Sequence, residues 1–295
     1  MKHLPWLYLA PALGAVGLFY LYPLVQTGVF SVFDLEFSTR IRPELWVGLE
    51  HFRIALSDTR FVSALGFTLV FSFFALALDL VLGTILALAA MHVHQKLRGL
   101  VRSFILIPWA IPPVIQGTMW RWILNGEAGP VGDILVRSGL VAQSPLFLAQ
   151  TVSATISLIF VFSWRGASMA TFFLLSGLSS LPLEVFDSAR IDGAGKLRTF
   201  FSINLPLMIP TVIVALLYRS MDALRVFDVV YALTGGGPGT STDTISSFAY
   251  NAFFRYSQFG QAAAYSVIMF GLALLVGIPL IFSTQGRLGR GVAGE

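Results

Sequence analysis

The sequence predicts an all-α, polytopic membrane protein with about six transmembrane helices. Of the 295 residues, 56% are hydrophobic and 12% are charged, a composition outside the range of soluble domains. The mean hydropathy is +0.79, and six windows are apolar enough over the roughly 20 residues that a helix needs to cross a bilayer. The chain has no Cys, so disulfides, thiolate metal sites and a cysteine nucleophile are excluded.

The six windows lie near residues 6–31, 62–90, 104–124, 150–177, 205–228 and 262–283. The first apolar run continues through Pro23 to about Phe33, which is too long for a signal peptide, so we expect an uncleaved span. Proline residues at 108, 112 and 113 predict that the third span bends or breaks around Ile107–Val114. Residues 1–295 are therefore expected to form a single transmembrane domain.

Lys and Arg placement favours cytoplasmic N- and C-termini, because cytoplasmic loops carry an excess of these residues. Residues 34–60 then form an outer loop, with a short interfacial helix expected after Trp46. The net charge of +4 is explained by this topology and by contact with anionic membrane lipid. No basic run suggests a nucleic-acid partner.

The same topology places residues 182–203, a polar island between the fourth and fifth windows, in the cytoplasm. Pro182 suits a helix start, and Gly193 can end a short helix in a left-handed turn. A second short helix is expected over 194–202, leading to Leu205-Pro206. The island is thus expected to be a rigid helix–turn–helix, although an ordinary amphipathic surface loop would use Asp and Gly in similar capping positions.

The pattern Asp187-Ser188-Ala189-x-x-Asp192-Gly193-Ala194, followed by Leu205-Pro206, resembles the coupling loop of ABC-importer permeases. Nearly the whole chain is similar to permease subunits of carbohydrate ABC importers of the maltose/trehalose/glycerol-phosphate type. It departs from that pattern at Asp187, where the family usually has Glu, and at Ser188, where it usually has Ala. The other matching segments are Leu9-Ala10-Pro11, Tyr22-Pro23, Val47-Gly48-Leu49, Leu106-Ile107-Pro108 and Leu233–Pro238.

The resemblance implies the type I importer permease fold and a bacterial or archaeal cytoplasmic membrane. It also implies four partner subunits: a second, different permease, two copies of an ATP-binding subunit, and an extracytoplasmic sugar-binding protein. The chain has no Walker A sequence, so we expect no catalytic residue, metal or cofactor in it, with ATP and Mg bound by the partners. The resemblance assigns ATPase coupling to Asp187, Ser188, Ala189, Asp192, Gly193 and Ala194.

Ionisable residues at membrane depth are candidate functional groups, because burying a charge there is costly. Four of them, Arg219, Asp222, Arg225 and Asp228, recur every three residues near the outer half of the fifth span, with alternating sign. Arg165, Arg219 and Asp222 supply the donors and acceptors that a sugar pocket needs, and Phe162 and Trp164 supply aromatic rings. A self-neutralising ladder of ion pairs would use the same charged residues. In the resembled family the sugar lies between the fourth and fifth spans, and the expected substrate-binding residues are Phe162, Arg165, Gly166, Met169, Arg219, Asp222, Ala223 and Arg225.

Further expectations concern the substrate, an alternative class of transporter, and polar residues of the second and third spans. The resemblance around Tyr218–Thr234 favours an α-linked disaccharide such as trehalose or maltose, with glycerol phosphate an alternative because of the Arg residues. An ion-coupled secondary transporter would use Asp79 or Asp222 as its carrier, but such transporters usually show more spans and internal repeats. We expect Asp79 to be hydrogen-bonded inside the bundle. Gln116, Trp120 and Arg121, near the outer end of the third span, are candidates for lining the pathway entrance, although anchoring in the membrane interface better explains the Trp.

Overall fold

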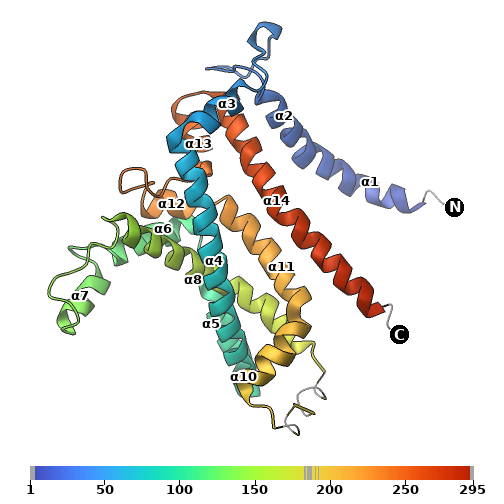
Figure 1. Ribbon diagram of the computed structural model, residues 1–295, viewed down its shortest axis with the longest axis vertical. Coiled ribbons are helices and arrows are strands. Elements are labelled where there is room, and N and C mark those ends of the chain that lie inside the picture. Colours follow the sequence, from blue (N-terminus) through green and yellow to red (C-terminus); the bar gives the residue numbers. More distant parts are fainter. Residues whose placement is uncertain (1–3, 183, 185–187, 190, 192, 293–295) are drawn as a thin grey trace. The chain divides into compact units, whose positions relative to one another are not determined.

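The computed structural model describes residues 4–182, 184, 188–189, 191 and 193–292. Within these residues the regular secondary structure is helical (Figure 1), with isolated β-bridges at Phe33–Trp46 and Glu36–Gln258. The predicted all-α fold is confirmed. The α-helices are α1 (Leu4–Val16), α2 (Tyr22–Phe30), α3 (Glu50–Ser57), α4 (Thr59–His92), α5 (Arg98–Ala110), α6 (Pro113–Ile123), α7 (Pro130–Arg137), α8 (Thr151–Ser179), α10 (Lys196–Thr199), α11 (Leu205–Leu224), α12 (Asp228–Leu233), α13 (Ile245–Tyr250) and α14 (Phe259–Val292). The tighter 3-10 turns are η2 (Pro43–Leu45) and η3 (Gln95–Leu97), and the wider π-helical segments are η1 (Gly17–Leu21), η4 (Phe200–Asn204) and η5 (Asn251–Arg255).

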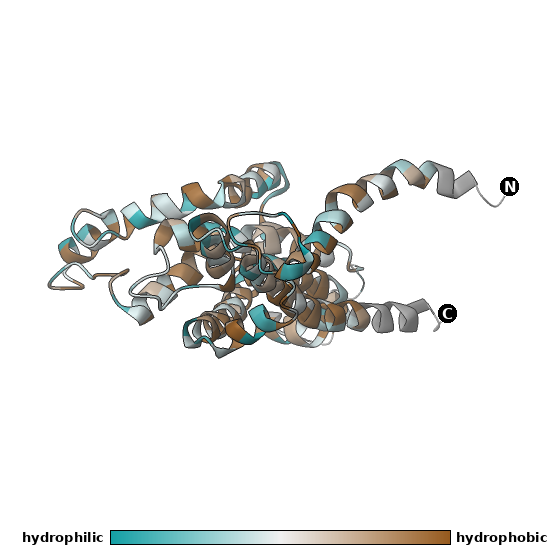
Figure 2. Ribbon diagram, turned by 90° about the horizontal axis from the view of Figure 1, so that it is seen from above, coloured by the Kyte–Doolittle hydropathy of each residue, from teal (hydrophilic) through white to brown (hydrophobic). Residues whose placement is uncertain are grey.

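The helices long and apolar enough to cross a membrane match the predicted windows. Within the described residues they are Tyr8–Phe30, Thr59–His92, Thr151–Ser179, Leu197–Leu224 and Phe259–Ser283. The pair Gln95–Ala110 and Pro113–Ile123 also qualifies when taken together, but it is bent by 91°. The bend lies between Ala110 and Pro113, within the range where the sequence predicted it. Hydrophobic residues recur along these long helices (Figure 2), as expected for surfaces that face lipid or other helices.

The fifth span differs from the prediction at its end. The window was expected to reach residue 228, which would place Arg219 and Asp228 on one helix. Instead α11 ends at Leu224, and Arg225 caps it with φ −102° and ψ 18°. Asp228 begins the separate helix α12, where a carboxylate favours the helix dipole. The predicted four-residue ladder on one helical face is therefore wrong beyond Arg225.

Proline explains two of the π-helical segments. η1 is followed by Tyr22-Pro23 and η4 by Leu205-Pro206, so each proline stands two residues after the segment. A proline has no N–H and its ring collides with the carbonyl four residues earlier. A wider turn relieves this collision, and the amides of Tyr22 and Leu205 bond five residues back, to Gly17 and Phe200.

The described residues form two compact units. The first contains the chain up to Leu65 together with Ile245–Gly271. Backbone hydrogen bonds join these segments, including those from Phe37 N to Ser257 O (2.9 Å) and from Phe259 N to Leu35 O (2.8 Å). Around the buried Phe61, the rings of Phe248 and Tyr265 lie at centroid distances of 5.5 and 4.7 Å.

The second unit contains Gly66–Thr244 and the chain from Leu272. Its central element is the helix α8. In the most apolar 18-residue stretch of α8, 61% of the residues are buried, and α8 contacts α5, α6, α11 and α12. Gly117 allows α6 to approach α12, since a Cβ at this position would lie 2.6 Å from the Ala232 side chain. The main buried cluster of this unit consists of Phe71, Ala75, Leu124, Leu158, Val161, Phe162, Ala223, Val226, Val229, Val230 and Leu233.

Candidate functional site

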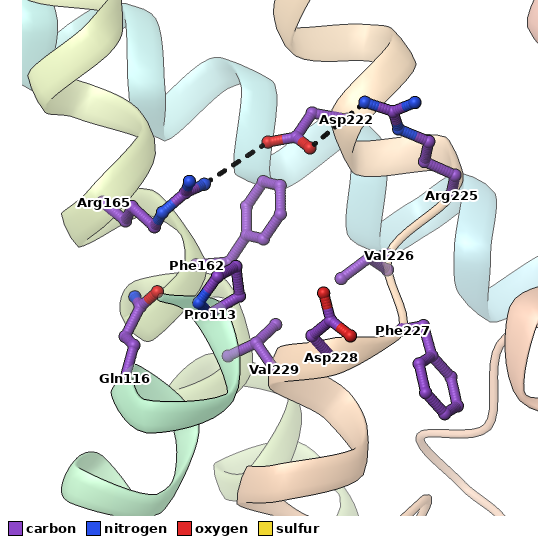
Figure 3. A pocket seen from close by; sticks show the side chains of 10 residues that line it. All are labelled: Pro113, Gln116, Phe162, Arg165, Asp222, Arg225, Val226, Phe227, Asp228 and Val229. Carbon is purple, nitrogen blue, oxygen red and sulfur yellow. Dashed lines mark ion pairs between the residues drawn. The ribbon is translucent and has the colours of Figure 1, made fainter. Parts of the chain in front are cut away.

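A cavity of about 280 Å³ opens in the second unit, where α6, α8, the end of α11 and the start of α12 meet (Figure 3). The bend at Pro113 brings the first turn of α6 to this point, and the end of α11 at Leu224 lets the chain turn back along the cavity. Its walls combine aromatic rings, charged groups and one buried amide. The lining residues are Pro113, Gln116, Phe162, Arg165, Asp222, Arg225, Val226, Phe227, Asp228 and Val229.

Asp222 is the centre of charge in this cavity. It accepts a hydrogen bond from Arg219 Nη1 at 2.6 Å. Arg165 Nη1 on α8 and Arg225 Nη2 approach the same carboxylate from two sides, at 3.8 and 3.9 Å (Figure 3). Both of these distances are too long for hydrogen bonds, so a hydroxyl group could bridge either pair, as water often does across such gaps.

A buried ion pair supports Asp222 from behind. Arg219 Nε donates to Asp79 Oδ2 at 2.7 Å, and the two side chains are 2% and 1% exposed. Asp79 lies on α4 and Arg219 on α11, so the pair ties these helices together. The prediction that Asp79 is hydrogen-bonded inside the bundle is confirmed.

Two residues of α8 shape the surroundings of this ion pair. The guanidinium carbon of Arg219 lies 4.8 Å from the centroid of the Phe162 ring, a cation–π distance. Gly166 lies beside the pair, and a Cβ there would stand 2.5 Å from both carboxylate oxygens of Asp79. A residue larger than glycine would therefore occupy the space that the ion pair uses.

The structure divides the predicted substrate residues into two groups. Phe162, Arg165, Asp222 and Arg225 line the cavity. The others are absent from the lining: Arg219, Gly166 and Ala223 are buried behind it and Met169 is half-buried on α8. In the sequence, a charged or small residue at membrane depth looks the same whether it lines the cavity or supports a lining residue from behind. The sequence could therefore not separate the two groups.

Of the three candidates in the third span, Gln116 lines the cavity, whereas Trp120 and Arg121 are absent from its lining. The side chain of Gln116 is 1% exposed, and its Nε2 donates to the backbone carbonyl of Val161 on α8. Asp228, a member of the predicted stripe of charges, also lines the cavity, but sequence reasoning missed Pro113, Val226, Phe227 and Val229. The signal at Pro113 is the bend itself, because a bend inside a span exposes polar backbone that must face protein or a cavity.

The predicted coupling segment is described in part. Asp187 and Asp192 lie outside the described residues. Gly193 has φ +70°, the left-handed conformation that the sequence predicted and that glycine adopts without strain. Ala194 N donates to Ala189 O at 2.9 Å, which closes this turn, and Ser188 Oγ donates to Glu184 O at 2.8 Å.

An apolar cavity of about 680 Å³ lies next to this segment. Ala194, Leu197 and Phe200 line one side of it, and Ile85 and Leu88 of α4 line the other. The segment after Gly193 and the helix that carries Asp79 thus line the same cavity.

Comparisons with known proteins identify the family. Residues 79–294 match the model of the binding-protein-dependent transport system inner membrane component. The trehalose/maltose transport system permease protein MalF of Thermococcus litoralis is 35% identical, with 97% of this chain and 95% of that protein covered. The sulfoquinovosyl glycerol transport system permease protein SmoG of Agrobacterium fabrum is 32% identical, with 92% and 86% covered.

Solved structures give the same fold. A bacterial ABC transporter involved in the import of the acidic polysaccharide alginate has a chain with a TM-score of 0.80. The match covers 96% of this chain and 95% of that one at 23% identity, which supports the fold and confirms the predicted importer-permease architecture. Such permeases are multi-pass inner-membrane subunits without an enzymatic activity of their own. The chain therefore belongs to the family of binding-protein-dependent transport system inner membrane components, the permease subunits of ABC importers.

Proposed function

We propose that this chain forms half of the translocation pathway of an ATP-driven importer for an α-linked disaccharide such as trehalose or maltose. The observation that carries the proposal is the cavity around Asp222. Its lining offers Phe162 and Phe227 as apolar ring faces, and Gln116, Arg165 and Asp222 as hydrogen-bonding groups. A sugar presents hydroxyls and flat apolar faces, so it needs this combination. The 35% identity to a trehalose/maltose permease supports the same choice.

The volume of the cavity is what we expect of one half of a sugar-binding site shared with a second permease. About 280 Å³ is at the lower limit of the roughly 300–1,000 Å³ found for small-molecule pockets. A second, different permease would supply the opposite wall, so that the sugar is enclosed between the two subunits. Substrate-binding roles then belong to Phe162, Arg165, Asp222 and Arg225, while Gly166, Met169, Arg219 and Ala223 position them.

Energy for transport would come from two copies of an ATP-binding subunit, which hold ATP and Mg. We assign docking on these subunits to the cytoplasmic segment 182–203, with Gly193 as the elbow between its two arms. The hydrogen bond from Ala194 N to Ala189 O closes the turn at Gly193, which supports its assignment as the elbow. An extracytoplasmic sugar-binding protein would deliver the disaccharide to the outer face, which includes residues 34–60, and both termini would lie in the cytoplasm.

Transport requires that each ligand binds one state of the pathway better than the other, because a ligand shifts a conformational equilibrium only through differential affinity. ATP and the loaded binding protein would favour the outward-open state. Release of sugar and hydrolysis of ATP would return the pathway to the inward-open state.

The test is uptake by the complete complex in proteoliposomes, with the binding protein outside and ATP inside. We expect accumulation of radiolabelled trehalose or maltose that depends on ATP and persists when an uncoupler collapses the proton gradient. Gly193→Pro should leave ATP hydrolysis in place but abolish uptake, with Gly195→Ala in the same segment as the matched control. Uptake that follows the ion gradient instead of ATP would refute the proposal in favour of a secondary transporter.

A further inference from the structure

Six ionisable side chains surround the cavity or support it from behind. Arg165, Asp222, Arg225 and Asp228 line it, and the buried pair Arg219–Asp79 lies directly behind Asp222. There are three guanidinium groups and three carboxylates, so their formal charges cancel. The balance depends on Asp79, because without it three Arg would face two Asp.

Asp79 reaches the cavity only through other residues. It is not among the lining residues, and its contact to the site is the 2.7 Å hydrogen bond from Arg219 Nε. Arg219 in turn donates to Asp222 at 2.6 Å and stands beside the ring of Phe162, which lines the cavity. Two side chains, Arg219 and then Asp222 or Phe162, therefore separate Asp79 from a molecule bound in the cavity.

Because the Arg219–Asp79 pair is buried, a change in the charge of either member would act strongly on a molecule in the cavity. Arg219 is 2% exposed and Asp79 is 1% exposed, so water and salt screen them weakly. An uncompensated charge here would act on the bound molecule much more strongly than an exposed surface charge. Discrimination between ligands of different charge then follows from electrostatic complementarity.

We propose that Asp79 is a specificity-determining residue. By neutralising Arg219 behind Phe162 it keeps the cavity electrically neutral, so that neutral sugars are accepted and anionic sugars are disfavoured. This inference rests on the proposed function, since it assigns the charge class of the sugar in the same cavity.

The test measures which of two nearly isosteric ligands the cavity prefers. The probes are trehalose and its 6-carboxylate, trehaluronic acid, which differ by one negative charge. The complete complex in nanodiscs is used with the binding protein omitted and a non-hydrolysable ATP analogue present, so that the cavity alone selects. Affinities for both probes are measured by saturation-transfer NMR, which detects weak ligands.

Three variants with known charge changes separate selectivity from folding. Asp79→Asn leaves one excess positive charge and should shift the affinity ratio toward trehaluronic acid by about tenfold or more. Arg219→Gln leaves Asp79 buried without its counter-ion, where a carboxylate takes up a proton, so the ratio should stay close to that of the wild type. The double variant Asp79→Asn/Arg219→Gln restores neutrality and should return the ratio to that of the wild type.

The outcomes decide the proposal. An unchanged ratio in an Asp79→Asn variant that assembles and binds trehalose would overturn it. The same conclusion would follow if only the double variant assembled, because the pair would then act as a structural tie. If the wild-type complex bound neither trehalose nor maltose, the proposed substrate would be wrong, and the charge test would be repeated with the sugar that it does bind and the uronate of that sugar.

Discussion

Gly166→Ala tests whether the space beside the Asp79–Arg219 pair is required. The added Cβ would stand 2.5 Å from both carboxylate oxygens of Asp79 and would also contact Arg219 Nη2. Free side-chain ends could move away at little cost. These two ends hold each other at 2.7 Å in a buried position, so relieving the contact means lengthening or breaking the ion pair.

The cost can be worked from these contacts. Overpacking a well-packed interior costs about 1–3 kcal/mol, and breaking a buried ion pair costs about 3–5 kcal/mol. Partial displacement of the pair should therefore lower the free energy of unfolding by about 3 kcal/mol, which corresponds to a fall in Tm of roughly 6–12 °C for a chain of this size.

The assay is thermal unfolding of the detergent-solubilised complex, followed with a fluorescent tag on this subunit. Gly66→Ala is the matched control, because it is another glycine inside a helix and a Cβ there would meet no atom of this chain within 4 Å. The control should raise stability by about 0.5–1 kcal/mol through helix propensity. Equal Tm values for the two variants would show that the ion pair does not need the space at Gly166.

Three other substitutions give distinct expected results. Arg225→Ala should raise the KM for uptake, yet change stability by less than about 0.5 kcal/mol, because this side chain is 68% exposed; a fall in Tm would contradict a binding role. Gln116→Leu should lower both sugar affinity and stability, the latter by about 1 kcal/mol, since it removes the hydrogen bond to Val161; uptake kinetics and thermal unfolding report the two effects. Gly193→Ala places a Cβ at φ +70° at a cost of about 1–2 kcal/mol, and should reduce the sugar transported per ATP hydrolysed without affecting insertion in the membrane. An unchanged ratio would show that the turn is not needed for coupling.

Sequence alone located the spans because the requirement for a membrane helix is local. About 20 apolar residues satisfy the bilayer whatever their neighbours are, and the break in the third span follows from Pro112 and Pro113 themselves. The left-handed turn at Gly193 was predictable for the same reason, since the glycine and the flanking helix signals lie within a few residues of each other.

The end of the fifth span was less predictable. The spacing of Arg219, Asp222, Arg225 and Asp228 is compatible with one continuous helix, and nothing local marks Leu224 as its last residue. Asp222 is shared by guanidinium groups from α8 and from its own helix, and Asp228 starts a helix that packs on α6. These contacts join residues far apart in the chain and override the local periodicity.

By itself, the sequence determined that this is an all-α membrane protein of the importer-permease type, because composition and short motifs carry that information. Only the tertiary structure decided which charged residues line the cavity and which hold them in place. Asp79 and Arg219 are 140 positions apart in the sequence, and a hydrophobicity pattern cannot predict that they form an ion pair. Their pairing depends on α4 and α11 lying against α8 at Gly166, where the absence of a side chain leaves room for two charges to neutralise each other out of reach of water.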